Sequence, residues 1–269
     1  MADEVEEEQR AAERKALSAR SVHKALRQEG EDELERSSSA LAWSALAAGL
    51  SMGLSLVAQG ALRHHLPESD WRILLVSFGY SAGFIAVTLG RQQLFTETTV
   101  TAVLPFLHHW RTDVLRNVMR LWTVVLAANL LGAFVFAWAA AWTTAFSPEL
   151  NSAMLDIGRH AVRHDFATAF VKAIFGGWMI ATMVWLMPSA QGARILVIVI
   201  ITWCLAAAEL THIISGSLDV MFAVMSGAVS WGTFLTHYAI PVLLGNSIGG
   251  VVFVAAINHA QVATDEKPL

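Results

Sequence analysis

Gly90-Arg91-Gln92-Gln93-Leu94-Phe95-Thr96-Glu97-Thr98-Thr99 is the stretch that decides the fold, because it separates two apolar runs. Residues 73–89 before it are apolar, and residues 100–107 after it are apolar but too few to cross a bilayer alone. A spanning helix needs about 20 apolar residues. Unpaired backbone groups cost several kcal/mol each in lipid, so a break must be covered by protein or line a cavity. We therefore predict a membrane helix broken at a first candidate for a permeation or binding site.

The composition predicts an integral membrane protein. Of the 269 residues 55% are hydrophobic, and from residue 40 onward long apolar runs alternate with short charged gaps. The net charge of −4 is small and gives no sign of nucleic-acid binding. Cys204 is the single cysteine, so an intrachain disulfide is excluded.

The apolar runs predict an all-α protein with six membrane spans in two halves of three. The predicted spans are residues 40–62, 73–107 with the first break, 121–146, 166–187, 195–229 with a second break at 209–217, and 237–256. The middle span of each half is broken. Because three is an odd number of crossings, the second half must be inverted relative to the first, which is a plan of transporters and channels.

Three regions follow from this layout. Residues 1–36 form a charged tail or helix, 37–260 the membrane domain and 261–269 a second tail. If both tails are cytoplasmic, that side holds twelve Lys and Arg residues against four on the other side, in agreement with the usual positive-inside asymmetry. The first tail is either a solvated segment or one that docks a partner or gates a pore.

Ionisable side chains inside spans are functional candidates, because burying them in a membrane is costly. They are Arg91, Glu97, Lys172, Glu209, His212 and Asp219. His212 is the only histidine inside a span, and it lies at the second break. Imidazole titrates near neutral pH and can exchange a proton. The alternative is a histidine that only supports packing.

Thr96 lies in the first break, and the expected symmetry places its hydroxyl where it can orient His212. Arg91 and Glu97 either pair with each other or face the permeant. Lys172 either reaches the membrane interface or, with Arg159 and Arg163, attracts anions to a vestibule.

The sequence pattern does not indicate an enzyme. No nucleophile–base pair, phosphate-binding glycine loop or metal-ligand cluster stands out in the sequence, and His160 and His164 lack a third ligand. We therefore expect no cofactor and no metal.

Three motifs in this order resemble the formate/nitrite transporter family. They are Leu94-Phe95-Thr96, the broken fifth span with His212, and Ile240-Pro241-Val242-Leu243-Leu244-Gly245-Asn246-Ser247-Ile248-Gly249-Gly250. The resemblance covers residues 37–260, and the surroundings of the first motif look like a divergent branch of the family.

The resemblance implies an aquaporin-like homopentamer in the cytoplasmic (inner) membrane of a bacterium, with one pore in each protomer. Members of the family pass small monovalent anions such as formate, nitrite and hydrosulfide, often with a proton. By match, His212 would be the central pore histidine, Thr96 its loop partner and Asn246 the polar group beside it. The resemblance assigns Tyr80 and Leu205 to an outer constriction, and Phe84, Leu94 and Phe95 to an inner one.

The chain departs from the family's pattern around the histidine. Gly216 and Gly177 stand where the family usually has asparagines, and Thr211 stands where a glutamate usually precedes the histidine. Gln93 replaces an acidic residue before the first motif, and Glu97-Thr98 follows it in place of Gly-Asn.

We therefore expect a channel or transporter for small monovalent anions or their weak acids, with permeation coupled to protonation near His212. The alternatives are a pore for a neutral solute or another small ion, and a non-conducting membrane sensor or scaffold.

Overall fold

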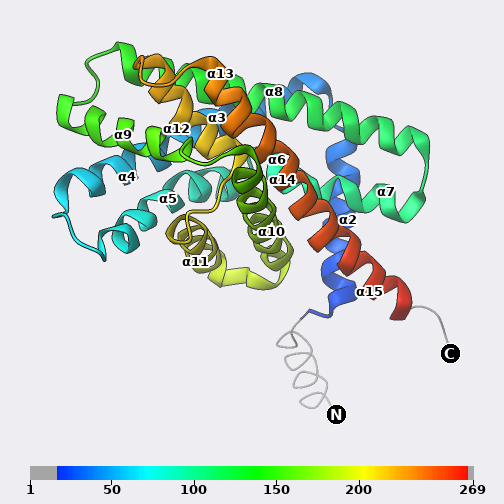
Figure 1. The fold of residues 1–269 in the computed structure, drawn as a ribbon. Helices are drawn as coiled ribbons and strands as arrows, with labels where there is room; N and C mark the ends of the chain where they lie inside the picture. The colour runs from blue at the N-terminus through cyan, green and yellow to red at the C-terminus, as the bar shows by residue number, and fades with distance from the viewer. Residues whose placement is uncertain (1–16, 266–269) are drawn as a thin grey trace.

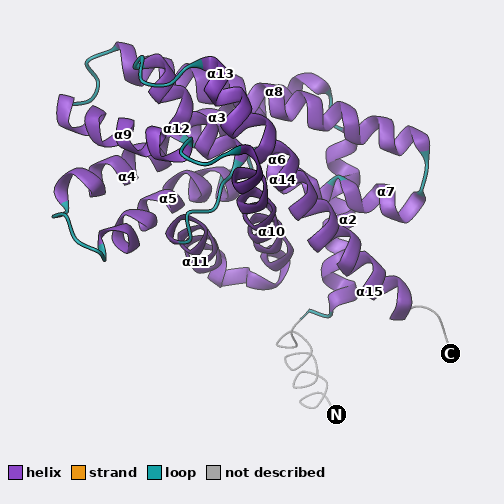
Figure 2. Ribbon diagram, viewed as in Figure 1, coloured by secondary structure: helices purple, strands orange, loops and turns teal. Residues whose placement is uncertain are grey.

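The computed structural model describes residues 17–265, and all regular structure in this range is helical (Figure 2). Residues 1–16 of the predicted first tail and 266–269 of the second lie outside the described residues. The helices in chain order are α2 (Ala19–Glu35), α3 (Ser38–Ser51), α4 (Gly53–His65), α5 (Arg72–Leu89), α6 (Phe95–Thr101), α7 (Val103–His109), α8 (Thr112–Trp142), α9 (Pro148–Ala161), α10 (Phe166–Ala190), α11 (Arg194–Ala207), α12 (Ile213–Met225), α13 (Trp231–Thr233), α14 (Ile240–Gly250) and α15 (Ile257–Asp265).

The prediction of an all-helical membrane protein is confirmed. Five stretches of the described chain are long and apolar enough to cross a membrane. One of them, Phe166–Ala207, contains both α10 and α11, which are separated by the short 3-10 helix η1 (Gln191–Ala193), whose first residue has a φ of 34°. The apolar helix α12 is shorter than a span.

Several helices differ in length from the predicted spans. The third begins at Thr112, nine residues before the predicted start, because its first turns carry charged side chains that a hydropathy pattern does not count. Arg120 on these turns donates hydrogen bonds to the carbonyls of Leu34 and Arg36 and so fixes the end of α2. The last stretch runs from Trp231 to Asp265, with two π-helical segments, η2 (Phe234–Ala239) and η3 (Val251–Ala256).

The two breaks have the same backbone conformation. After α5, Arg91 adopts a left-handed φ of 54°, and the N–H of Gln92 donates to the Val87 carbonyl over 3.0 Å. After α11, Glu209 adopts a φ of 52°, and the N–H of Leu210 donates to the Leu205 carbonyl, also over 3.0 Å. A left-handed non-glycine residue costs about 1–2 kcal/mol. The repetition of this conformation at both breaks indicates that neither is a local irregularity.

Close helix packing surrounds the breaks. The helices α3 and α8 pack together on one side, and α10 and α14 pack together on the other (Figure 1). Helix α2 contacts α6, α7 and α15, and so lies across the first break. The described part of the predicted N-terminal tail is therefore a helix that packs on the membrane domain.

Candidate functional site

Two asparagines satisfy the backbone of the two breaks. The Asn129 side chain on α8 accepts from the Phe95 N–H over 2.9 Å and donates to the carbonyls of Ala45 and Gln93 over 2.7 and 2.9 Å. The side chain is fully buried. It therefore replaces helical hydrogen bonds on both sides of Leu94, as a break in a bilayer requires.

Asn246 on α14 makes the corresponding contacts at the second break. Its side chain accepts from the Ile213 N–H over 2.8 Å and donates to the carbonyls of Ala173 and Thr211 over 2.7 and 3.0 Å. Asn129 thus bonds the backbone on both sides of Leu94, and Asn246 bonds the backbone on both sides of His212. Leu94 and His212 therefore occupy equivalent positions in the two breaks. Asn246 acts here by shaping the backbone around His212.

His212 has both ring nitrogens engaged. Its side chain caps α12, with Nδ1 accepting from the Ser215 N–H over 3.2 Å. Its Nε2 lies 2.7 Å from the Thr96 hydroxyl oxygen of the first break. Because Nδ1 accepts, the proton of the neutral imidazole belongs on Nε2 and points at Thr96. The two breaks thus meet through one side-chain hydrogen bond, and His212 is fully buried there.

A row of rings leads away from His212. The Phe84 ring packs edge-on against the imidazole, with 5.0 Å between centroids, and Tyr80 packs against Phe84 at 5.2 Å. Phe84 therefore contacts the histidine itself. Leu94 and Leu205 are fully buried, and Phe95 is buried with its ring against Trp122 of α8.

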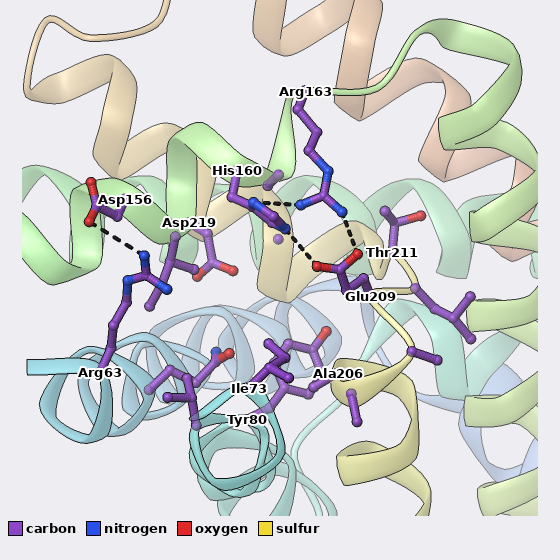
Figure 3. Close-up of a pocket in the computed structure, with 18 of the residues that line it drawn as sticks. Arg63, Ile73, Tyr80, Asp156, His160, Arg163, Ala206, Glu209, Thr211 and Asp219 are labelled. Atoms are coloured by element: carbon purple, nitrogen blue, oxygen red, sulfur yellow. Dashed lines mark hydrogen bonds and ion pairs between the residues drawn. The ribbon is translucent and has the colours of Figure 1, made fainter. Parts of the chain in front are cut away.

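One cavity, which we call the α9 cavity, has a volume of about 500 Å³ and lies between α4, α5, α9 and the second break (Figure 3). Its lining includes the buried residues Tyr80, Thr211, Gly216, Asp219 and Tyr238. Because Thr211 lines it, the cavity reaches the residue that precedes His212 in the chain.

The charges around the α9 cavity are largely paired with each other. Arg63 lies 3.6 Å from Asp156, and Arg163 donates to both His160 and Glu209 (Figure 3). Burial and the nearby Arg163 lower the pKa of His160 below its ordinary value, which agrees with its ring accepting from this arginine.

The two other cations expected in a vestibule lie apart from the cavity lining. Lys172 is half-buried, and its ammonium group donates to the Glu209 carbonyl over 3.0 Å. Arg159 is exposed on α9 and is not among the residues that line the cavity. The attraction of anions expected from Arg159, Arg163 and Lys172 together is therefore partly offset.

The second cavity, the α2 cavity, has a volume of about 280 Å³ and lies between α2 and the first break. Gln93, Glu97 and Thr101 line it, and Glu33 of α2 reaches into it. Glu33 accepts from the Gln93 amide over 2.7 Å and from the Thr101 hydroxyl over 2.6 Å. Because Gln93 lines it, this cavity reaches the residue that precedes Leu94 in the chain. One cavity therefore borders each break, and the Thr96–His212 contact joins the two breaks.

Of the two alternatives for Arg91 and Glu97, the pairing with each other is wrong. Arg91 bonds Glu29 of α2 over 3.0 Å, and the carboxylate of Glu97 accepts from the Thr88 hydroxyl over 2.8 Å. Arg91 has a left-handed backbone, and its side chain reaches α2, a neighbour that the sequence pattern does not predict. Both residues line the α2 cavity.

The comparisons with known proteins agree with this geometry. A family model described as formate/nitrite transporter matches residues 20–260. The inner membrane protein YfdC of Escherichia coli strain K12 is 43% identical over 247 residues, which are 92% of this chain and 80% of that protein.

The chain belongs to the formate/nitrite transporter family.

More distant relatives carry names that specify an ion. The formate channel FocA of Haemophilus influenzae is 22% identical, with 80% of this chain and 84% of that protein aligned. A solved pentameric formate channel with formate bound has a TM-score of 0.68 at 21% identity, covering 84% of this chain and 98% of that one. A solved channel of the same family has a TM-score of 0.75 at 16% identity, covering 92% and 99%. These structural matches show the fold of formate/nitrite transporters.

Two departures from the sequence pattern of formate/nitrite transporters have a physical reason. A side chain at Gly177 would collide with the backbone of Asn246, so the helices α10 and α14 require glycine at this contact. A side chain at Gly216 would collide with the Tyr238 hydroxyl, which itself donates to the His212 carbonyl over 3.1 Å. The Tyr238 hydroxyl thus fills the space that a larger residue at 216 would take.

Sequence reasoning missed Asn129 as part of the site. It is a single amide in the apolar third span, at the place that corresponds to Asn246 in the sixth span. A comparison of the two predicted halves could have found it.

Proposed function

We propose that the chain is a channel or transporter for small monovalent anions, passed as their neutral weak acids, with the permeation path running between the two cavities past Thr96 and His212. The observation that carries this proposal is the 2.7 Å contact between these two side chains, because it joins the two broken spans at a buried point with a cavity on either side.

The central segment is apolar apart from this contact. Phe84 and Leu94 are fully buried beside it, and a bare anion there would lose its hydration at a cost of several kcal/mol or more. The neutral acid of the same ion crosses at a much smaller cost. Proton transfer before or at this segment therefore lowers the barrier.

Thr96 and His212 then act as hydrogen-bond donors at the narrowest part. Since Nδ1 of His212 holds the end of α12, the imidazole has only its Nε2 side available, and the Thr96 hydroxyl is its immediate partner. A passing acid or anion can exchange this hydrogen bond for one with its own oxygen. We place the outer constriction at Tyr80 and Leu205, and the inner one at Phe84, Leu94 and Phe95.

We also propose a homopentamer in a bacterial inner membrane, with residues 1–36 and 261–269 on the cytoplasmic side. A relative is a pentameric formate channel, and another is an inner membrane protein. The helices carry many exposed apolar side chains, such as Trp43, Trp138 and Trp142, which suit contact with lipid or with other copies.

A neutral-solute pore on the same scaffold is the second candidate, because the cations of the α9 cavity are already paired with carboxylates. A pore of this kind would show a flux that does not depend on pH.

Uptake into vesicles that contain the purified full-length protein tests the proposal. Formate, nitrite and hydrosulfide are offered singly at acidic and at neutral pH, with urea as the neutral solute and protein-free vesicles as the baseline. We expect uptake of at least one weak acid to exceed the baseline and to rise as the pH falls. The variant His212→Ala should lower this uptake by about tenfold, or about 1.4 kcal/mol of barrier.

The result that would reject the proposal is wild-type uptake of all three anions at the protein-free rate. If wild type and His212→Ala show the same uptake above the protein-free rate, the role of His212 is rejected but the proposal of a channel stands.

A further inference from the structure

Asp219 is a buried carboxyl group that the proposed path through Thr96 and His212 does not use. It lies on α12, seven residues after the N-cap His212 and so about two turns along the helix. Only 5% of the residue is exposed, and it lines the α9 cavity. One carboxyl oxygen, Oδ1, has no hydrogen-bond partner among the described residues.

Among the residues that the structure describes, the cations around Asp219 are already paired with other carboxylates. Figure 3 shows its carboxyl group pointing into the cavity, between the Arg63 side chain and the cluster of His160, Arg163 and Glu209. Arg63 pairs with Asp156, and Arg163 pairs with Glu209. A carboxylate left without a cation or a full set of donors in such a place is costly, whereas the neutral acid is not.

The other ionisable groups that line the cavity belong to the elements packed around Asp219. They are Arg63 from α4, Tyr80 from α5, Asp156, His160, Arg163 and His164 from α9 and the turn after it, Glu209 from the second break, and Tyr238 from η2. The helices α3 and α14 also approach α12 but contain no charged residue, and α8 carries its charges only between Asp113 and Arg120.

We infer that Asp219 is a second protonatable group of the path, which gives its proton to an incoming small anion in the α9 cavity. The inference rests on the proposed function. The O–H bond of the Asp219 carboxyl group breaks, a new O–H bond forms on formate or nitrite, or a new S–H bond on hydrosulfide, and no oxidation state changes. The neutral acid moves on toward Phe84 and His212, and the Asp219 carboxylate regains a proton from bulk water.

This arrangement also makes Asp219 a specificity-determining residue. After the transfer the carboxylate repels any second anion, while the neutral acid is not repelled, so only the protonated species advances. Tyr80 and Tyr238 line the same cavity. The Tyr80 hydroxyl can donate to the anion during the transfer, whereas the Tyr238 hydroxyl already donates to the His212 carbonyl. A permanently ionised anion such as chloride, which takes no proton at physiological pH, has no such route.

The test is the pH profile of formate uptake into vesicles by wild type and Asp219→Asn. Asparagine keeps the size and the hydrogen-bond capacity but carries no acidic proton. We expect uptake by this variant to follow the concentration of free formic acid, and so to fall about tenfold for each pH unit. Wild type should have a shallower slope, because the carboxyl group supplies the proton. Asp219→Glu, which keeps an acidic proton, should restore the shallow slope.

Asp165→Asn is the matched control. Asp165 is exposed outside the cavity and caps α10, a role that asparagine also fills, so its pH profile should match the wild type. Infrared difference spectra of the wild type provide a second readout, in which a buried protonated carboxyl band should be present and should disappear in Asp219→Asn. Glu33 and Glu97 can give a similar band, so the spectra are recorded in a background with both replaced by glutamine, where the band belongs to Asp219 even if Asp219→Asn does not assemble.

A conducting wild type with an unchanged profile in Asp219→Asn, or the absence of the carboxyl band in that glutamine background, would overturn this inference and leave the proposed function standing. Wild-type uptake at the protein-free rate would overturn both.

Discussion

Asn129 and Asn246 make the same three hydrogen bonds at equivalent positions of the two breaks, although they lie far apart in the sequence, on α8 and α14. Each accepts one backbone N–H and donates to two carbonyls. Each helix that supplies the first carbonyl has a glycine four residues later, Gly49 or Gly177, that packs against the asparagine's own backbone. The repetition indicates that the two halves of the membrane domain hold their breaks by one construction.

Loss of either asparagine side chain should destabilise the protein to a similar degree. Asn129→Ala and Asn246→Ala each leave one buried N–H and one buried carbonyl of a break without partners, and each such group costs about 1–3 kcal/mol. The carbonyls of Ala45 and Ala173 lie inside helices and keep their helical hydrogen bonds. We expect a loss of about 3 kcal/mol or more in the free energy of unfolding, measured by denaturant unfolding in detergent. Asn258→Ala is the control, because Asn258 only bonds the Val254 carbonyl of its own helix. A wild-type midpoint for both core variants would mean that the breaks are held by other contacts.

Replacing the glycines that pack against the two asparagines should also destabilise the protein. The added Cβ of Gly49→Ala or Gly177→Ala would collide with backbone, which cannot move as a side-chain end can, so we expect about 1–3 kcal/mol of destabilisation. Gly232→Ala in α13 meets only Ser230 at 3.6 Å and should be neutral. Equal thermal midpoints in the three variants would show that the helix pairs have more room than the structure indicates.

Glu33 should make the docking of α2 depend on pH. Burial raises the pKa of Glu33 to about 7, against the opposing hydrogen bonds from Thr101 and Gln93, with smaller effects from Glu29 and Arg36. A rise of this size is worth about 3 kcal/mol. Because the pKa is raised in the folded state, this stabilisation is complete below the ordinary value of 4.5 and is lost as the pH rises through about 7.

Hydrogen exchange of the α2 amides, corrected for intrinsic rates, measures this effect. Protection should decrease as the pH rises through about 7. Glu33→Gln keeps the contacts with a neutral group and should show protection that is independent of pH in this range. A wild type whose α2 protection does not change would contradict the burial of this carboxyl group.

Removing the Glu209 charge should change the attraction of anions to the α9 cavity. Glu209 occupies Arg163 and His160, so Glu209→Gln frees a guanidinium beside the cavity. We expect anion uptake to rise about two- to fivefold at low salt and to return to the wild-type rate at high salt, where screening removes the field. Glu149→Gln, an exposed residue on α9, is the control. An increase that persists at high salt would point to a change in the pore itself.

The sequence was sufficient to predict the membrane class, both breaks and the residues at them. Apolar runs too short to span a bilayer mark the breaks directly, and a lone histidine in a span is easily noticed. The contacts of the long polar side chains could not be predicted. Arg91 turns to α2 and not to Glu97, because a left-handed backbone residue sets its direction. Asn129 was missed since one amide in an apolar span gives no periodic signal.

Thiol modification at position 96 tests the central claim most directly. In a Cys204→Ser background, which removes the native cysteine, Thr96→Cys places a small reactive group at the meeting point of the two breaks. Weak-acid uptake is measured in vesicles before and after treatment with a small membrane-permeant thiol reagent, with the extent of modification read by mass spectrometry. The account predicts that modification lowers uptake by about tenfold or more, as a blocked barrier requires. Full modification with unchanged uptake would contradict a path past Thr96 and His212.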